Sequence, residues 1–176
     1  GMSAYDKGSI FLSQLQYIIG KDNFDNTLKK YFDDWSFKHP KPNDFIRSAE
    51  KVSGLELDWY LLDWAQSTMT IDYSINSVYG VDSKTKIVLK RIGQMGMPVD
   101  VRIVLDSGDS LDFNIPMTKM RGSKPVENST LLESWSWAKP YYEFWIDVDS
   151  NKISKILIDP KNEMADINRD NNSLDL

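Results

Sequence analysis

The sequence contains no cysteine and only one histidine, and these two shortages exclude several kinds of chemistry. Without cysteine the chain can form no disulfide, no thiolate nucleophile and no cysteine-ligated zinc site. A zinc site with two histidines on one helix is excluded as well, because it needs a second histidine. His39 stands in a loop sequence between Lys38 and Pro40, where we expect it to be exposed to solvent. We therefore expect no metal or other cofactor bound to residues 1–176 alone.

Long apolar runs and clusters of positive charge are also missing. No apolar run approaches the ~20 residues that a membrane-spanning helix needs, and the chain does not open with the charged and apolar regions of a signal peptide. The net charge is −5, and both signs are spread along the chain without a basic face. We therefore expect neither nucleic acid nor a membrane among its partners.

Apolar and aromatic residues are plentiful. Hydrophobic residues make up 41% of the chain, which includes six tryptophans. This composition is enough for a packed core and argues against a disordered chain.

The first seventy residues have the spacing of amphipathic helices. In the opening segment Phe11, Leu15 and Ile18 recur at helical intervals, and Gly20 is a plausible stop. A second helix follows, with Asp22 as its expected N-cap, and a third helix with Asn43 as its expected N-cap. Gly54 should end the third helix, and a fourth is expected over residues 57–66. Four short helices with short connections predict a compact helical packet.

From about residue 71 onward the period of the apolar residues changes to two, which is typical of half-buried antiparallel strands. Residues 107–109 are expected to make a tight hairpin turn between two strands, and residues 149–151 another such turn between two further strands. Residues 121–131 read as a loop, Trp135 and Trp137 as neighbours on one face of a strand, and the polar tail after Met164 as poorly ordered. The expected strands are, in order, residues 71–75, 86–92, 99–105, 111–117, 142–148 and 153–158.

The predicted fold class is therefore α+β: an N-terminal packet of about four α-helices followed by a small antiparallel β-sandwich. The expected domains are a helical domain over residues 1–70 and a β-sandwich domain over residues 71–165. Residues 166–176 form the polar tail.

An ordered series of short motifs runs through the helical part. It begins with Tyr5-Asp6-Lys7-Gly8 ahead of the first helix. It continues with Ile19-Gly20, a helix that ends in Tyr31-Phe32 and Trp35, a proline-rich loop into Asp44-Phe45, then Val52-Ser53-Gly54, Leu57-Asp58-Trp59-Tyr60 and Asp63-Trp64. In this order and spacing the series resembles the end of the catalytic domain of the aminopeptidase N family, the zinc metallopeptidases called gluzincins. The resemblance covers roughly residues 4–70.

The resemblance implies an activity and a role for one residue. Members of that family remove amino-terminal residues from peptides, and the tyrosine of the Tyr-Glu/Asp-Lys-Gly segment lends its hydroxyl to the oxyanion of the tetrahedral intermediate. Tyr5 holds that position here, so the resemblance makes it the candidate catalytic residue. The family also implies a β-sandwich after the catalytic helices, in agreement with the strand pattern.

The chain departs from the family in its metal ligands. The family holds zinc with a His-Glu-x-x-His helix and a more distant glutamate, all upstream of the tyrosine segment. One histidine cannot supply that set. The chain is therefore expected to be the carboxy-terminal part of such an enzyme, with the upstream zinc-binding half as its partner, peptides as the parent's substrates, zinc only in the parent, and no activity alone.

A different class of function stays open. A helical packet joined to a β-sandwich can serve as a non-catalytic binding or structural module. In that case an apolar helix face without its former neighbour would be exposed, which predicts self-association.

Other residues are weaker candidates. Asp166–Asp170 resembles the opening of a calcium loop, but Asn171 stands where glycine is wanted and the chain ends before the expected glutamate. Four aspartates could pair for acid–base chemistry, although such residues usually form the solvated face of a helix: Asp33, Asp34, Asp58 and Asp63. Several aromatic residues could line a sugar- or peptide-binding surface, although most are expected in the core: Trp59, Trp64, Trp135, Trp137, Tyr141, Tyr142 and Trp145.

Overall fold

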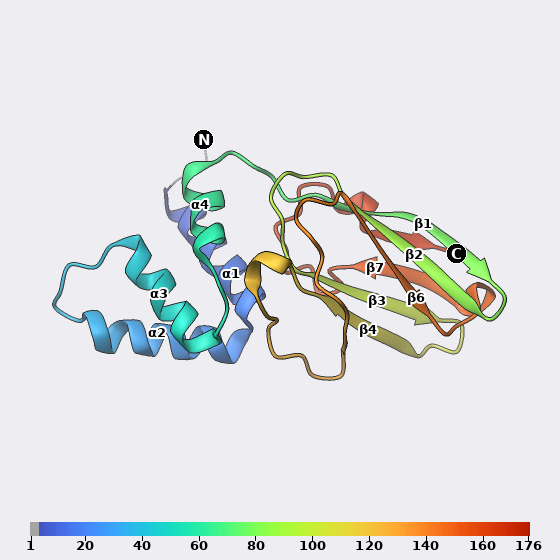
Figure 1. Cartoon of the computed structure of the whole chain (residues 1–176), viewed down its shortest axis with the longest axis horizontal. Coiled ribbons are helices and arrows are strands. Elements are labelled where there is room, and N and C mark those ends of the chain that lie inside the picture. Colours follow the sequence, from blue (N-terminus) through green and yellow to red (C-terminus); the bar gives the residue numbers. More distant parts are fainter. Residues whose placement is uncertain (1–3) are drawn as a thin grey trace.

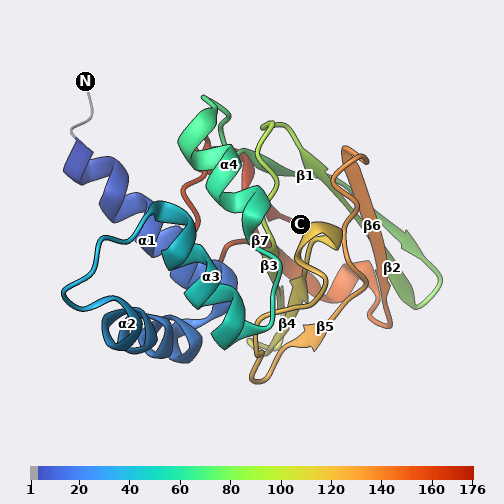
Figure 2. The same cartoon turned by 60° about the vertical axis from the view of Figure 1, so that its left-hand side comes forward.

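The structure is a computed structural model that describes residues 4–176, with side chains described from Lys7 onward. As the sequence predicts, the fold is α+β, with helices first and strands after them. The helices gather at one end of the molecule and the two sheets at the other (Figures 1 and 2). In the part of the chain that is described, no helix is both long and apolar enough to cross a membrane. The helices are α1 (Ala4–Ile19), α2 (Lys21–Trp35), α3 (Pro42–Ser53) and α4 (Asp58–Gln66).

Glycines separate the helices where the sequence predicts them to. Gly20 follows α1 with a φ of 86°, and Gly54 ends α3 in the left-handed conformation with a φ of 72°. Both values lie in a region that other residues rarely adopt. The turns after α1 and α3 therefore depend on residues without a Cβ atom.

The two predicted helix caps are wrong. Gly20 occupies the N-cap of α2, and Asp22 lies inside the first turn of the helix. Lys41 occupies the N-cap of α3, because Pro42, with its fixed φ, starts the helix two residues earlier than expected. The carboxylate of Asp44 accepts a hydrogen bond of 2.8 Å from the backbone N–H of Lys41 and so satisfies this start.

The strands form two sheets that pack face to face. One sheet has the order β1-β2-β6, and the other has the order β5-β4-β3-β7-β8. All pairs are antiparallel except β4 with β5. Phe113 of β4 and Phe144 of β6 meet across the two sheets with ring centroids 5.4 Å apart. The strands are β1 (Tyr73–Val81), β2 (Lys84–Arg91), β3 (Val99–Leu105), β4 (Ser110–Ile115), β5 (Thr130–Leu131), β6 (Tyr141–Ile146), β7 (Ile153–Ile158) and β8 (Ser173–Asp175).

The connections confirm one predicted turn and correct another. Residues 107–109 join the paired strands β3 and β4, as a hairpin turn should. Residues 149–151 connect β6 to β7, but these strands belong to different sheets, so this segment is a crossing and no hairpin. Its geometry is a short 3-10 helix over Ser150–Lys152.

Of two further expectations in the C-terminal half, one is wrong and the other is confirmed except for its last two residues. Trp135 and Trp137 do not share a strand face: Trp135 is buried beside Met117, whereas Trp137 is 54% exposed in a turn. Residues 121–129 form the expected loop, and only the last two residues of the range 121–131 form the short strand β5. This stretch pairs with β4 only through the two residues of β5, and Trp135 makes an isolated bridge with Met117, just after β4.

The polar tail is folded onto the sheet and is not the disordered end that its composition suggests. Strand β8 pairs with β7, and Asn172 is buried. The backbone N–H of Ile158 donates a hydrogen bond of 2.8 Å to the carbonyl oxygen of Asn172. Backbone pairing therefore holds a segment that has few apolar side chains.

Helix α1 is attached to the sheets by buried polar contacts. The Tyr17 hydroxyl donates to the carbonyl oxygen of Pro98 at 3.1 Å and accepts from the N–H of Asp100 at 3.2 Å. The Gln14 side chain binds the backbone of Glu163 and Ala165 at 2.8 and 2.9 Å. The buried apolar residues of the helices and the sheets form one continuous core, so α1 has a fixed orientation against the sandwich.

Candidate functional site

The Tyr5 backbone lies in the first turn of α1, but its side chain lies outside the described residues. Its predicted catalytic role therefore stays a prediction. The next two residues of the motif, Lys7 and Gly8, are exposed and line a large cavity. This cavity lies beside the start of α1.

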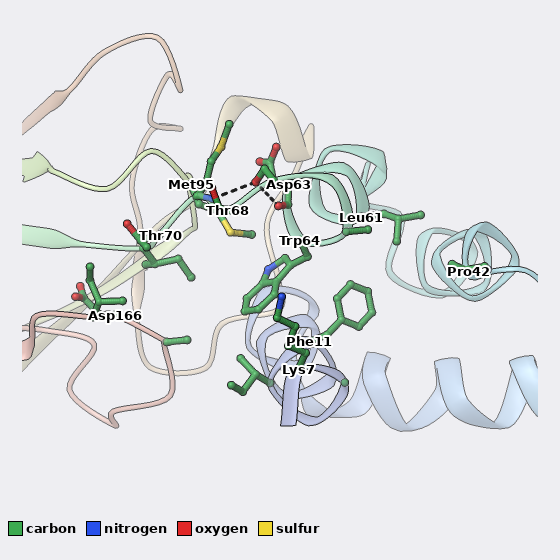
Figure 3. A pocket seen from close by; sticks show the side chains of 18 of the residues that line it. Lys7, Phe11, Pro42, Leu61, Asp63, Trp64, Thr68, Thr70, Met95 and Asp166 are labelled. Carbon is green, nitrogen blue, oxygen red and sulfur yellow. Dashed lines mark hydrogen bonds between the residues drawn. The ribbon is translucent and has the colours of Figure 1, made fainter. Parts of the chain in front are cut away.

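The cavity lies at the junction of the helices and the sheets and has a volume of about 780 Å³. We call it the junction pocket (Figure 3). Five separate stretches of the chain line it: the first half of α1, the start of α3, α4 from Leu61 with the segment that follows, the β2–β3 connection, and residues 165–167. Its apolar lining includes Ile10, Phe11, Phe45, Leu61, Trp64, Met69, Ile71, Met95 and Ile167.

Aromatic packing fixes the helical wall of the junction pocket. Phe11 of α1 stacks on Tyr60 of α4 with ring centroids 4.9 Å apart, and it meets the edge of Trp64 at 6.4 Å. The Tyr60 hydroxyl donates a hydrogen bond of 2.6 Å to the carbonyl oxygen of Phe11. Burial raises the pKa of Tyr60, so this hydroxyl keeps its proton at neutral pH. Helices α1 and α4 are thus held together where they line the pocket.

The wall of the junction pocket opposite helices α1 and α4 is formed by residues 70–72 and the β2–β3 connection, whose backbones pack closely against each other. The carbonyl oxygen of Thr70 accepts a hydrogen bond of 3.1 Å from the N–H of Met95. A Cβ atom on Gly93 would stand 2.3 Å from that same oxygen and 2.6 Å from the N–H nitrogen of Asp72. Only glycine leaves room for the β2–β3 connection to lie against residues 70–72.

Asp166 borders the junction pocket but has a structural role. Its carboxylate accepts hydrogen bonds of 2.9 Å from the backbone N–H groups of Tyr73 and Asn168. Next to it, the N–H of Ile167 donates to the carbonyl oxygen of Ile71 at 3.0 Å. These contacts give the carboxylate at the start of the suspected calcium loop an alternative role, in which it tethers residues 166–168 to β1.

Two polar groups in the junction pocket have a distinctive environment. The indole Nε1 of Trp64 is shielded from solvent and has no hydrogen-bond partner among the described residues. The Asp63 carboxyl is partly buried, and burial raises its pKa, against a smaller opposite effect of Lys119. Periodicity places Trp64 on an inward face, but the missing partner of its N–H cannot be read from sequence.

The other candidate carboxylates do not join this site. Asp33 and Asp58 are exposed on α2 and α4. Asp34 pairs with Lys30 at 3.0 Å, and this hydrogen bond lowers the pKa of Asp34. Among the four predicted aspartates, only Asp63 lines the junction pocket.

The candidate aromatic surface is divided between core and surface. Trp59 and Trp135 are buried, whereas Trp137, Tyr141 and Trp145 are about half exposed. Tyr142 is half-buried, and burial raises its pKa to about 12. Each exposed ring has a lysine nearby: Lys119 lies 5.0 Å from Trp137, Lys90 lies 5.7 Å from Tyr141 and Lys86 lies 5.9 Å from Trp145.

The described residues do not fit a zinc ion. His39 is exposed in the loop between α2 and α3. Throughout the described part of the chain, no group of three or more histidine, cysteine, aspartate or glutamate side chains gathers closely enough to hold a metal. The donor set that zinc requires is therefore not assembled by these residues.

Comparisons with known proteins agree with the motif series in the helical part. Residues 1–64 match the sequence profile of the Peptidase family M1 domain. No curated protein sequence matches the chain. Among solved structures, the fold is similar to that of the Legionella pneumophila aminopeptidase A in complex with aspartic acid, with a TM-score of 0.56 and 17% sequence identity over 88% of this chain. The chain spans only 16% of the length of that protein, and at this identity the likeness concerns the fold.

Proposed function

We propose that this chain is the C-terminal part of a zinc-dependent aminopeptidase that removes amino-terminal residues from peptides. The observation that carries the proposal is the match of residues 1–64 to the Peptidase family M1 domain, with Tyr5-Asp6-Lys7-Gly8 at the start of α1. The similarity of the fold to an aminopeptidase supports it.

In this proposal Tyr5 donates its hydroxyl hydrogen to the oxyanion that develops on the scissile carbonyl. Such a donor is effective only if it is held in position before the reaction, and its loss typically costs about 10²–10³ in rate. The contacts of α1 with Tyr60 and with the backbone of Pro98 and Asp100 supply a rigid base for that helix. The chain's contribution to catalysis would be this fixed donor and one wall of the cleft.

The metal-binding half would be a separate part of the parent protein, upstream of Tyr5. Residues 7–176 do not assemble a zinc site, so the chain alone should be inactive. The helical part also exposes apolar side chains that such a partner could cover. Phe32 on α2 is 70% exposed, and Phe37, whose φ is 61°, is fully exposed in the following loop.

The alternative is a non-catalytic helical and β-sandwich module, and the exposed Phe32 and Phe37 bear on it as well. If no other part of a parent protein covers them, the same surface should drive self-association. Sedimentation velocity at increasing concentration tests this alternative. A monomer at all concentrations, which Phe32→Ser leaves unchanged, would count against it.

The experiment that tests the proposed function is a comparison of Tyr5→Phe with the unchanged residue in a protein extended upstream from the gene. Aminopeptidase activity on aminoacyl chromogenic substrates should fall about 10²-fold or more, because one oxyanion donor is lost. Zinc content should not change. Tyr79→Phe is the matched control, since Tyr79 lies on β1 and is 55% exposed. Equal turnover of the Tyr5→Phe and parent proteins would remove Tyr5 from the mechanism.

A further inference from the structure

Strand β6 is the least protected edge of the two sheets. Edge strands tend to pair with other chains unless they are short, bulged or covered. Of the four edge strands in the described part of the chain, β5 and β8 have two and three residues, and β1 contains a register shift between Ile75 and Ser77. Strand β6 has six residues, contains no proline, and pairs with β2 without a register shift. The edge of β6 that faces away from β2, here called the open edge, is therefore a template for a further strand.

The hydrogen-bond register shows which backbone groups of β6 point toward the open edge. The N–H of Arg91 donates to the carbonyl oxygen of Pro140 at 2.8 Å, and the β2–β6 register places these two residues opposite each other. In an antiparallel pair, such hydrogen-bonded residues alternate with residues that do not bond across the pair. The residues that turn their N–H and C=O groups away from β2 are therefore Tyr141, Glu143 and Trp145. Their six groups have no backbone partner among the described residues.

The side chains of the same three residues lie on the outer face of the sheet. The rings of Tyr141 and Trp145 are about half exposed, so they offer apolar area to a strand that pairs with the open edge. The Glu143 carboxylate lies 2.7 Å from the ammonium group of Lys86 on β2. The alternate residue Phe144 is buried between the sheets, so a further strand would not disturb its packing.

The two ends of β6 carry opposite charges. Three cations stand at its first residues, and none of them forms an ion pair among residues 7–176: Lys90, Arg91 and Lys139. Three aspartates line a hollow at its other end: Asp106, Asp147 and Asp149. Two lysines offset part of this negative charge, since Lys84 lies 2.8 Å from Asp147 and Lys152 lines the same hollow. Such a strand complements a second copy of itself that runs in the opposite direction.

We propose that β6 pairs antiparallel with β6 of a second copy of this chain, around a two-fold axis at Glu143. Tyr141 then lies opposite Trp145 of the second copy, and the two Glu143 residues lie opposite each other. In this register every N–H and C=O group on the open edge gains a hydrogen bond in both copies. A register shifted by two residues would leave one of the three residues of each copy without a partner in β6.

The same register brings the basic end of each strand to the acidic end of the other. Lys139 comes to lie next to Asp147 of the second copy, and the two-fold axis repeats this contact at the other end. The two Glu143 carboxylates form the one like-charge contact along the strand, which is unfavourable, but each of them is already paired with Lys86. The three-stranded sheets of the two copies would join into one continuous sheet.

Sedimentation velocity and hydrogen exchange of the 176-residue chain test the dimer. A contact of one strand pair is small, so we expect a monomer below about 50 µM and a growing dimer fraction toward about 1 mM. NMR at both concentrations then locates the contact. The N–H groups of Tyr141, Glu143 and Trp145 should exchange at least tenfold more slowly in the concentrated sample. A monomer at the higher concentration, or unchanged exchange of these three groups, would overturn the proposal.

Two substitutions at one position separate the backbone from the charge. Glu143→Pro and Glu143→Gln both remove the carboxylate, but only proline also removes the N–H that points to the open edge. Glu143→Gln should dimerise at least as tightly as the parent, because the like-charge contact is lost. Glu143→Pro should weaken the dimer tenfold or more, since two hydrogen bonds are lost across the two-fold axis. Equal dimerisation of the two variants would contradict the pairing.

An exchange of charges gives a test that does not depend on the folding of Glu143→Pro. Asp147→Lys places like charges at both ends of the strand pair and should weaken the dimer, and adding Lys139→Asp should restore it. Failure of the double variant to restore dimerisation would contradict the register.

Phe32→Ser is the control for the position of the interface, because it changes an exposed apolar residue of α2. The dimer should persist in this variant. A dimer that is lost in Phe32→Ser and kept in Asp147→Lys would place the contact on α2 and overturn the proposal. None of these measurements involves zinc or peptide hydrolysis, so their outcome is independent of the proposed function.

Discussion

At the scale of single residues, Tyr73 shows how one buried hydroxyl stabilises the junction between strands. Its hydroxyl donates to the carbonyl oxygen of Met97 at 3.0 Å and accepts from the N–H of Met97 at 2.8 Å. Tyr73 is 1% exposed, so water cannot replace the hydroxyl at either backbone group. One side chain therefore satisfies both polar groups of the Met97 backbone.

Replacing Tyr73 with phenylalanine should lower the free energy of unfolding by about 1–3 kcal/mol, because two buried backbone groups lose their partner. Urea unfolding followed by circular dichroism measures the difference. Tyr79→Phe on the exposed face of β1 is the matched control and should change stability by less than about 0.5 kcal/mol. Equal effects of the two substitutions would show that the Tyr73 hydrogen bonds contribute nothing measurable.

The same residue predicts a dependence of stability on alkaline pH. Burial raises the pKa of Tyr73 from 10.0 to about 12. Between these values the unfolded chain releases the phenol proton and the folded chain keeps it, so the folded state binds more protons and stability falls as pH rises. Between pH 9 and pH 12 the free energy of unfolding should fall more steeply in the parent chain than in Tyr73→Phe. Parallel curves would contradict the assigned pKa.

Residue roles were predictable from sequence only where a single side chain decides them. The exposure of His39 follows from its charged and proline neighbours, and the missing second histidine follows from a count. The unpartnered N–H of Trp64 could not be predicted, because it depends on which backbone carbonyls the fold brings near. The burial of Trp135 and the exposure of Trp137 could not be predicted either, because they depend on the turn that the chain makes between the two residues.

At the scale of elements, helices and long strands followed from the period of the apolar residues, and short elements did not. Strands β3 and β7 have the bounds that alternation predicts. Strands β5 and β8 have two and three residues, too few to show a period, and their pairing partners hold them in place. The N-cap of α3 was missed because a proline at the first position moved the start of the helix, and the N-cap of α2 was missed because Gly20 occupies it.

Gly93 provides a prediction for how the elements are joined. Gly93→Ala would place a Cβ atom 2.3 Å from the Thr70 carbonyl oxygen, so the β2–β3 connection must move away from residues 70–72. We expect a loss of about 1–3 kcal/mol, as for other overpacked sites. Thermal unfolding measures the loss.

The control for Gly93→Ala is Gly8→Ala on α1, where an added Cβ atom meets no atom within 4 Å. That change should not destabilise the chain, because alanine favours a helix more than glycine does. A loss of stability in Gly8→Ala as large as in Gly93→Ala would show that crowding at residues 70–72 is not the cause.

At the scale of the whole molecule, the candidate site lies where the two parts of the fold meet. The junction pocket is lined by residues from the first turns of α1, from the end of α4 and from residues 165–167, which are far apart in sequence. Periodicity predicts each part but not how they are oriented, because that depends on buried contacts such as those of Gln14 and Tyr17. The motif series predicts Tyr5 as a site residue, and the structure adds the junction pocket, which Lys7 and Gly8 of the same motif line.

The family profile matches residues 1–64, and the chain spans 16% of the length of the aminopeptidase structure. The proposed activity must therefore be tested on a protein that includes more than this chain. A catalytic centre with zinc requires ligands that residues 7–176 do not gather. The proposed function therefore depends on what the gene encodes ahead of Tyr5, and on whether that part restores activity.

The most direct measurement is aminopeptidase activity and zinc content, determined on the same samples, for this chain and for the protein extended upstream. We expect one zinc per chain and hydrolysis of aminoacyl substrates only in the extended protein. Activity and bound zinc in the 176-residue chain itself would contradict the account, and so would an extended protein that binds no zinc and hydrolyses nothing.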